Sequence, residues 1–457
     1  MFFRQVLYRD LGCASYVLGD HGEAVVVDPR WDIDVYLELA ADEGLTIVQV
    51  LDTHDHADHV SGRLRLAAAT GARARRADPT GEDPDGIAAG EEIAVGDLRI
   101  LAVASPGHRP EHLAFAVCDL ARGHEPWMLL TGDSLLVGDI ARPDLAYEAT
   151  EGAQALHATL RQLTGVGDQV EVWPAHVGGS LCGGDNLSGK TNSTVGFERR
   201  HNPLLLLGET EFVGELTESL PSRPPNIEQI VALNRRREAD PLPALDALDP
   251  DALRPLLAAG VTVLDARAPE EFDRGHLRNA INLPVASPGV GTRAGWALSP
   301  DEQIVVVAAE PRGAQRMISA LQAVGFWHLA GFALADLEAW RAAGLDTAES
   351  GSWDLDRVAA GLQDHIVELV DVREPSEWAR GHVPGSHHVP LHRMRDIESV
   401  PTAADGRTTA VACAAGARAA FAASLLRRAG HDDVVRVTGG GVPDLGARGL
   451  ELQSGRD

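Results

Sequence analysis

The chain of 457 residues is too long for one hydrophobic core, and its 44% hydrophobic and 23% charged residues are ordinary for globular domains, of which we expect two to four. The formal net charge of −27 argues against nucleic acid and anionic membrane surfaces as partners, because both are bound through cationic side chains. Four widely spaced cysteines without a CxxC pair argue against a disulfide framework, so any thiol chemistry involves single cysteines in a reducing compartment.

The first twenty residues contain no long apolar stretch, and therefore no signal peptide is expected. No window approaches the roughly 18 apolar residues that span a bilayer. We predict a soluble, cytoplasmic protein.

Residues 1–240 contain short apolar runs that are typical of β-strands, and each run ends in a polar residue suited to metal binding. The runs are residues 22–29, 46–54, 98–108, 126–134 and 169–176. The Pro-rich stretch near residue 245 is predicted to be a linker.

The ends of these runs carry a set of metal-ligating residue types. The segment THDHADH contains three imidazoles and a carboxylate within six residues, and two more histidines and an aspartate follow downstream. The full set is His54, His56, Asp58, His59, His108, Asp133 and His176. Because strand ends and tight loops can bring such groups onto one ion, we predict a metal site.

This order of ligands resembles the metallo-β-lactamase superfamily, whose fold is an αββα sandwich of two mixed sheets flanked by helices. All seven ligand positions are filled, so the ligands leave open one metal or two. The superfamily's glyoxalase II-type zinc hydrolases use all seven. Its persulfide dioxygenases hold one Fe(II) with three ligands, which here would be His54, His108 and Asp133, a two-His, one-carboxylate set. The resemblance then implies that His56, Asp58, His59 and His176 orient the ligands and the substrate.

Two further stretches resemble the dioxygenase subfamily. Residues 132–145 place Arg142 and Asp144 at its recurrent positions, and residues 174–184 resemble its GSLCG loop. Arg142 and Cys182 are therefore expected near the substrate. Cys13 has a weaker case for such a position, and Cys118 is expected in the core.

The second half of the chain contains a duplicated unit. A DxRxPxE(F/W)xRGH element occurs at residue 265 and again at residue 371, each time preceded by an apolar strand and followed by a further strand and an Ala/Leu-rich helix. Strands that alternate with helices predict parallel α/β domains, which we place at residues 245–350 and 352–457, with a linker near residue 352. The polar residues of both copies are expected to hold loops together through hydrogen bonds and not to act as catalysts.

The second copy contains Cys413-Ala-Ala-Gly-Ala-Arg418 between a strand and a helix. Such a loop surrounds the sulfur with backbone N–H groups at a helix N-terminus, which lowers the thiol pKa. The module resembles a rhodanese domain, in which Cys413 would carry a persulfide and Arg418 would shape or charge its cradle. Tyrosine and arsenate phosphatases also hold an anion behind a cysteine, but the six-residue loop fits a sulfurtransferase better.

The first copy lacks the cysteine. Aligned on the glycine, Glu310 stands in place of Cys413 and Gln315 in place of Arg418. We therefore predict that this rhodanese-like domain is catalytically silent and serves as a spacer or docking module.

This order of domains resembles the persulfide dioxygenase–rhodanese fusions of bacterial sulfide detoxification. The resemblance implies one Fe(II) per chain, with a small-molecule thiol persulfide, O₂ and sulfite as reactants, and thiosulfate made at Cys413. It leaves a homo-oligomer open. Two alternatives remain: a zinc-dependent thioester hydrolase of glyoxalase II type with sulfur-sensing rhodanese modules, and a non-enzymatic sulfur-relay protein.

Overall fold

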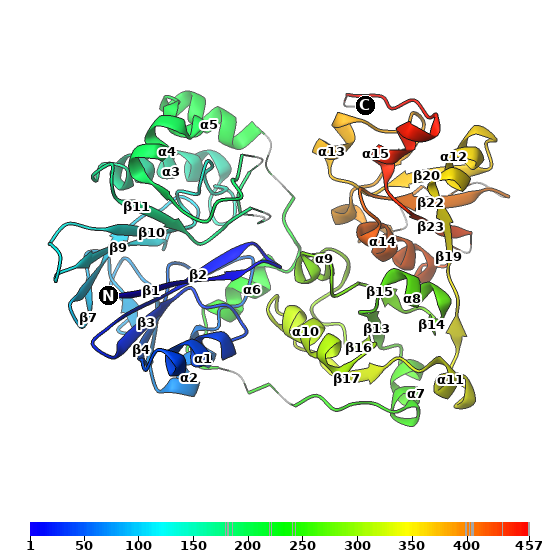
Figure 1. Ribbon diagram of the computed structural model, residues 1–457, viewed down its shortest axis with the longest axis horizontal. Helices are drawn as coiled ribbons and strands as arrows, with labels where there is room; N and C mark the ends of the chain where they lie inside the picture. The colour runs from blue at the N-terminus through cyan, green and yellow to red at the C-terminus, as the bar shows by residue number, and fades with distance from the viewer. Residues whose placement is uncertain are drawn as a thin grey trace. The chain divides into compact units, whose positions relative to one another are not determined.

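The computed structural model describes residues 1–178, 180, 182–184, 186–218, 220, 222–239, 241–242, 244–397, 400–401, 403, 406–431 and 433–455. The chain divides into two compact units, drawn in Figure 1. The first comprises Met1–Pro241 with Ala323–Gly325, and the second comprises Leu242–Gln322 and Phe326–Asp457. Both rhodanese-like modules therefore belong to the second unit. Within the described part of the chain, no helix has the length and apolarity to cross a bilayer.

The first unit is built on two six-stranded sheets. The first sheet has the order β1-β2-β3-β4-β5-β6, with β1 Phe2–Tyr8, β2 Cys13–Asp20, β3 Glu23–Val27, β4 Thr46–Asp52, β5 Arg73–Ala77 and β6 Gly86–Ile87. The second has the order β12-β11-β10-β9-β8-β7, with β7 Glu92–Val95, β8 Leu98–Ala104, β9 Leu113–Asp119, β10 Met128–Gly132, β11 Glu171–Pro174 and β12 Ser193–Thr194. The helices are α1 Asp34–Asp42, α2 Arg63–Thr70, α3 Ala149–Leu163, α4 Val195–His201, η1 Pro203–Leu206, α5 Glu209–Glu218 and α6 Ile227–Asn234. Each of the five apolar runs predicted from the sequence contains a strand: β3, β4, β8, β10 and β11.

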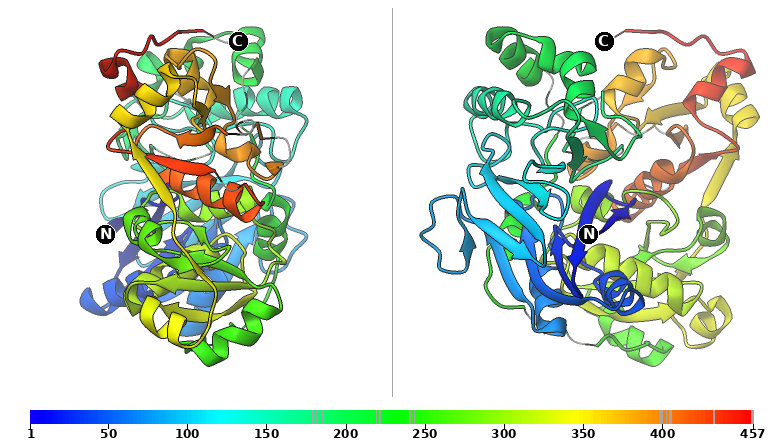
Figure 2. Two further views of the ribbon diagram at one scale, coloured as in Figure 1. Left: turned by 90° about the vertical axis from the view of Figure 1, so that its right-hand side faces the viewer. Right: turned by 60° about the vertical axis from the view of Figure 1, so that its left-hand side comes forward.

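The sheets form the two inner layers of a sandwich with helices outside, as Figures 1 and 2 show. Side chains alternate between the faces of a strand, so each sheet has an inner and an outer apolar face. Leu18 and Phe115 pack between the sheets. Tyr36 of α1 packs against the outer face of the first sheet, and Leu156 of α3 with Phe212 of α5 packs against the second. The predicted αββα architecture is confirmed.

The second unit contains two parallel sheets. The first has the order β15-β13-β16-β17, with β13 Thr262–Asp265, β15 Ile281–Asn282, β16 Ile304–Ala308 and β17 Leu329–Leu334, and a small separate sheet pairs β14 His276–Leu277 with β18 Thr347–Ala348. The second has the order β19-β23-β22-β20-β21, with β19 Gly351–Asp354, β20 Val367–Asp371, β21 His387–His388, β22 Thr408–Ala412 and β23 Val434–Thr438. The helices are α7 Pro250–Ala258, α8 Pro269–Arg274, α9 Val290–Ala297, α10 Pro311–Gln322, α11 Leu337–Ala342, α12 Leu355–Gln363, α13 Pro375–Arg380, η2 Leu391–Arg393, α14 Ala417–Arg428, α15 Val442–Leu445 and η4 Gly446–Arg448.

The predicted duplication is visible in the strand pairing. Asp265 at the end of β13 pairs with Val307 of β16, and Asp371 at the end of β20 pairs with Ala412 of β22. Within the linker predicted near residue 352, residues 351–354 form strand β19, which pairs in parallel with β23. A stretch that its composition alone assigned to a loop is thus held by backbone hydrogen bonds at the edge of a sheet.

Candidate functional site

The predicted metal ligands follow four strands that end at neighbouring positions. The segment 53–59 follows β4, and His108, Asp133 and His176 follow β8, β10 and β11. Strands β8 and β10 both pair antiparallel with β9, and β11 pairs in parallel with β10, so their carboxyl ends lie at one edge of the second sheet. One donor atom from each of His54, His108 and Asp133 lies within 4.8 Å of the others.

The hydrogen bonds of the imidazoles show which nitrogens face this edge. The Thr53 hydroxyl donates to the Asp28 carboxylate, so its oxygen accepts from His54 Nδ1 at 2.9 Å. His108 Nδ1 donates to the carbonyl oxygen of Arg142 at 2.9 Å. With Nδ1 protonated, the Nε2 atom of each of these two rings carries a lone pair.

These Nε2 atoms and that of His176 face the same carboxylate oxygen, Asp133 Oδ2. The distances to it are 3.8 Å from His54, 3.4 Å from His108 and 3.1 Å from His176. Within the part of the chain that the structure describes, all three nitrogens and both Asp133 oxygens are buried without a hydrogen-bond partner. Buried lone pairs that face one another in this way are costly unless a cation lies among them, so the donor set fits a metal ion.

The charge states of His54, His108 and Asp133 suit metal binding. Burial, together with neighbouring imidazoles, lowers the pKa of His54 well below its usual value, and burial also lowers the pKa of His108. Burial would raise the pKa of Asp133, but the adjacent imidazole of His176 outweighs it and lowers that pKa. Neutral imidazoles and an ionised carboxylate are the forms that bind metals.

The remaining four predicted residues form a second group beside the first. His56, Asp58 and His59 each place a donor atom within 4.8 Å of the others, and His176 Nε2 lies 3.6 Å from Asp58 Oδ2. His56 Nδ1 and His59 Nε2 are buried and lack a hydrogen-bond partner among the described residues. This group therefore has ligand atoms of its own for a second ion.

Asp28 and His112 support the site, and the sequence patterns did not single them out as supports. Asp28 accepts hydrogen bonds from Thr53, and one of its carboxylate oxygens lies 3.2 Å from His56 Nε2. Burial would lower the pKa of His56, but the nearby Asp28 carboxylate outweighs burial and raises that pKa to about 9. The backbone of Asp28 has a φ of 51°, a strained value for a residue with a side chain, as found at functional sites. His112 Nε2 accepts a hydrogen bond from the backbone N–H of Asp133 at 2.8 Å, and burial lowers its pKa to about 3. Asp28 follows β3, the same kind of position that revealed the ligands, whereas His112 directly precedes β9.

Asn234, the last residue of α6, holds the loop that carries the first three histidines. Its Nδ2 donates to the carbonyl oxygens of His56 at 2.9 Å and His59 at 2.8 Å. Its Oδ1 accepts from the backbone N–H of Ser61 at 2.8 Å. A residue 175 positions away in the chain thus fixes the backbone of the metal-binding loop.

The two residues expected near the substrate are both buried. Arg142 donates two hydrogen bonds to the Asp144 carboxylate, and its carbonyl oxygen orients His108. Cys182 Sγ lies within 4.8 Å of donor atoms of Asp133 and His176, and burial raises the pKa of its thiol to about 12. Gly179 and Leu181 of the predicted GSLCG loop lie outside the described residues.

In the second unit, Cys413 follows β22 and precedes α14. The thiol is buried, and the backbone N–H of Gly416 donates to Sγ at 3.0 Å. Gly416 has a φ of 96°, which only glycine adopts without strain. At Gly441 an added Cβ would lie 2.2 Å from the carbonyl oxygen of Cys413, so this second glycine allows close packing of the loop.

Arg418 is held beside this loop by an ion pair. It donates to both carboxylate oxygens of Glu377, whereas Arg373 donates to Asp371 and to the carbonyl oxygen of Gly381. The prediction that these polar residues staple loops is confirmed for Asp371 and Arg373. It is incomplete for Glu377, which joins α13 to the cysteine loop.

The strand register corrects the alignment of the first module. In the second module, the backbone N–H of Val442 donates to the carbonyl oxygen of Cys413. In the first module, the corresponding hydrogen bond runs from the backbone N–H of Ala335 to the carbonyl oxygen of Ala308. Ala308, and not Glu310, therefore stands in the position of Cys413. Helix α10 begins three residues after Ala308, whereas α14 begins four residues after Cys413. The second residue of α10 is Arg312 and the second residue of α14 is Arg418. Arg312, and not Gln315, is therefore the counterpart of Arg418.

Two domain families and several known proteins match parts of this chain. The profile described as Metallo-beta-lactamase superfamily matches residues 8–176, and the one described as Rhodanese-like domain matches residues 249–343 and 354–445. Bovine persulfide dioxygenase ETHE1 (Bos taurus) is 30% identical over 228 residues, which are 49% of this chain and 83% of the relative. Hydroxyacylglutathione hydrolase of Synechococcus sp. is 33% identical over 159 residues, 34% of this chain and 59% of the relative. The crystal structure of a metallo-beta-lactamase from Staphylococcus aureus superposes with a TM-score of 0.64 and 27% identity, covering 74% of this chain and 99% of that one.

The fold and the clustered ligands define a metallo-beta-lactamase domain that is followed by two rhodanese-like domains. Within that class, the chain belongs to the family of persulfide dioxygenase ETHE1, through its N-terminal half. The fold class and the family expected from the sequence are confirmed.

Proposed function

We propose that the chain is an Fe(II)-dependent persulfide dioxygenase with a sulfurtransferase domain. The observation that carries this proposal is the set of unpaired ligand atoms on His54, His108 and Asp133, a two-His, one-carboxylate set that suits a single non-haem iron. The family relationship and the cysteine loop of the second rhodanese module support it.

The iron ion, when bound, supplies O₂ activation, which redox-inert Zn²⁺ cannot supply. The chain itself contributes orientation: Thr53 and the carbonyl of Arg142 set the two rings so that their Nε2 atoms face Asp133. The net reaction is RSSH + O₂ + H₂O → RSH + SO₃²⁻ + 2 H⁺, in which the outer sulfur is oxidised and O₂ is reduced.

Cys413 would then convert sulfite to thiosulfate. Its thiolate attacks the outer sulfur of a second RSSH, so that the S–S bond breaks, RSH leaves with the proton, and an anionic persulfide remains on Cys413. Sulfite attacks that sulfur, which releases S₂O₃²⁻ and restores the thiolate. The N–H of Gly416 and the guanidinium of Arg418 stabilise these anionic forms.

A zinc-dependent thioester hydrolase is the second candidate. The unpaired His56 Nδ1 and His59 Nε2 favour it, because they complete a site for a second ion, and hydroxyacylglutathione hydrolases are among the relatives. Under this alternative the rhodanese modules would sense or deliver sulfur.

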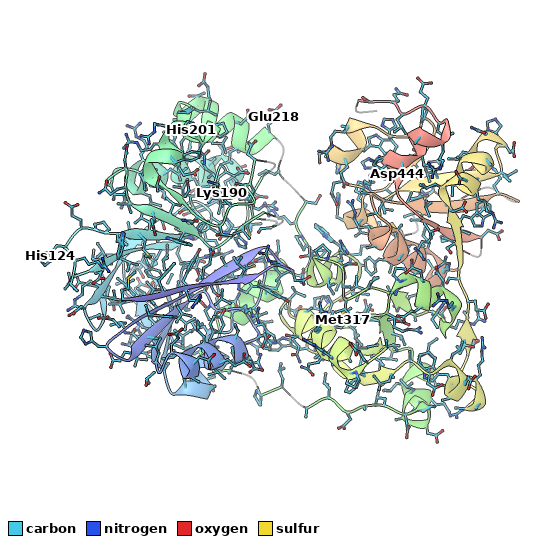
Figure 3. The ribbon with its side chains drawn as sticks, in the orientation of Figure 1. His124, Lys190, His201, Glu218, Met317 and Asp444 are labelled. Atoms are coloured by element: carbon cyan, nitrogen blue, oxygen red, sulfur yellow. The ribbon has the colours of Figure 1, made fainter. Side chains whose placement is uncertain are left out.

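Metal analysis of the full chain, purified without O₂, separates the candidates. We expect one equivalent of iron and O₂ uptake that depends on a low-molecular-weight thiol persulfide such as glutathione persulfide. His108→Ala should abolish both, whereas His124→Ala, at an exposed turn away from the sheets (Figure 3), should abolish neither. Two equivalents of zinc in active protein without iron would refute the proposal in favour of the hydrolase. Absence of persulfide-dependent O₂ uptake from iron-loaded protein would favour a sulfur-relay protein.

A further inference from the structure

The thiol of Cys13 lies beside the second group of ligands. Cys13 Sγ donates a hydrogen bond to Asp58 Oδ2 at 3.1 Å, and His59 Nδ1 lies 3.0 Å from the other oxygen, Asp58 Oδ1. The Asp58 carboxylate is therefore engaged at both oxygens. None of the sequence motifs indicates this contact, since the two residues are 45 positions apart.

Backbone pairing sets the position of this thiol. Cys13 forms a bridge with His176, and the backbone N–H of Ala14 donates to the carbonyl oxygen of Ala175 at 2.6 Å. The backbone N–H of Val177 donates in turn to the carbonyl oxygen of Gly12. These bonds join the start of β2 to the segment after β11, and they fix the backbone position from which Sγ reaches Asp58.

Asp58 Oδ2 also faces the imidazole of His176, a ligand that a second ion would share. It lies 3.6 Å from His176 Nε2, which is buried and has no hydrogen-bond partner among the described residues. A hydrogen bond to a charged oxygen is stronger than one to a neutral acceptor, and it competes with a cation for the same lone pairs.

We propose that Cys13 is a positioning residue that sets the number of metal ions: its hydrogen bond to Asp58 weakens the second site, so that the chain holds one. This inference rests on the proposed function, which needs a single iron. It gives a reason why a chain with all seven ligands present works with one ion.

Titration of the full-length, metal-depleted chain with Zn²⁺ tests the proposal, with bound metal counted by mass spectrometry after buffer exchange. The unaltered chain should bind one equivalent tightly. Cys13→Ala removes the donor and should tighten the second equivalent by about 10- to 100-fold. Cys13→Ser keeps a donor and should behave as the unaltered chain does, as should Cys118→Ala. Cys118 is a suitable control because it is only half-buried on β9, where we had expected a core position.

The outcomes separate the two ideas. If Cys13→Ala binds the second equivalent no more tightly than the unaltered chain, the role of Cys13 is refuted while the single-metal function stands. If Cys13→Ser tightens the second site as Cys13→Ala does, the donor role is also refuted. Two tight equivalents in the unaltered chain would overturn both this inference and the proposed function.

Discussion

Arg418 donates two hydrogen bonds to the carboxylate of Glu377, from Nη1 to Oε2 at 2.5 Å and from Nη2 to Oε1 at 2.8 Å. Paired in this bidentate manner, the guanidinium is fixed relative to the cysteine loop, since Arg418 lies in the first turn of the helix that follows Cys413. The pair therefore connects the DxRxPxEW element to the helix that follows the cysteine loop.

We expect Glu377→Gln to raise the KM for sulfite in thiosulfate formation by about tenfold, because a guanidinium without its partner is no longer held where it attracts an anion. Persulfide-dependent O₂ uptake should not change. Glu271→Gln is the matched control, since Glu271 occupies the same position in the first module and is exposed. A lowered kcat with an unchanged KM would contradict this role for the ion pair.

Cys413→Ser should separate the two proposed activities. The cysteine lies in a different module from the candidate metal ligands, so O₂ uptake should be retained while the product changes from thiosulfate to sulfite. Ion chromatography of the products, together with an oxygen electrode, measures both. Collapse of O₂ uptake in a variant that keeps its metal would argue against two independent sites.

A cysteine restored to the first module should remain inactive. Ala308→Cys in a Cys413→Ser background places the thiol at the position that the strand register identifies. The loop that follows is one residue shorter than in the second module, and Glu310 caps the helix where the second module has Gly416. A carboxylate there repels an anionic persulfide. Sulfurtransferase activity above that of the Cys413→Ser background would contradict the prediction that this module is silent.

Asn234→Ala should weaken metal binding without touching a ligand. The change removes three buried hydrogen bonds to the metal-binding loop, which we expect to lower the free energy of unfolding by about 3 kcal/mol. The affinity for the metal should fall by about tenfold, because the loop no longer holds its histidines in place. Asn234→Asp keeps the acceptor for Ser61 but sets a buried carboxylate oxygen against the carbonyl oxygens of His56 and His59, so its effects should be at least as large. Unchanged metal affinity in Asn234→Ala would show that the loop is held by other contacts.

His276 should make the second unit sensitive to acid. Its ring stacks on Phe272 at 3.7 Å, and burial lowers its pKa to about 4, whereas the unfolded chain has a value near 6.5. Below pH 6.5 the unfolded chain takes up a proton that the folded chain does not, so stability present above pH 6.5 is lost as the pH falls towards 4. The loss amounts to about 3 kcal/mol at most. Denaturant unfolding at pH 7 and pH 4.5 should show a smaller difference for His276→Gln than for the unaltered chain, and an equal difference would contradict this assignment.

Local patterns are sufficient for much of this protein. A strand followed by a polar residue can be recognised within ten residues, and this is why the segments that end near His54, His108, Asp133 and His176 were predicted correctly as strands with candidate ligands. The duplicated element at Asp265 and Asp371, and the loop at Cys413, are likewise contiguous. The αββα order came from the resemblance to the metallo-β-lactamase superfamily, and the parallel sheets of the second unit followed from the alternation of strands and helices.

Contacts between distant segments were decided only by the folded chain. The hydrogen bond of Cys13 to Asp58 depends on the pairing of β2 with the end of β11, and that of Asn234 depends on where α6 packs. Strand register, which no single segment contains, moved the counterpart of Cys413 from Glu310 to Ala308. The physical reason is that side-chain periodicity reports on one element at a time, whereas register and packing depend on backbone hydrogen bonds and buried surfaces shared between elements.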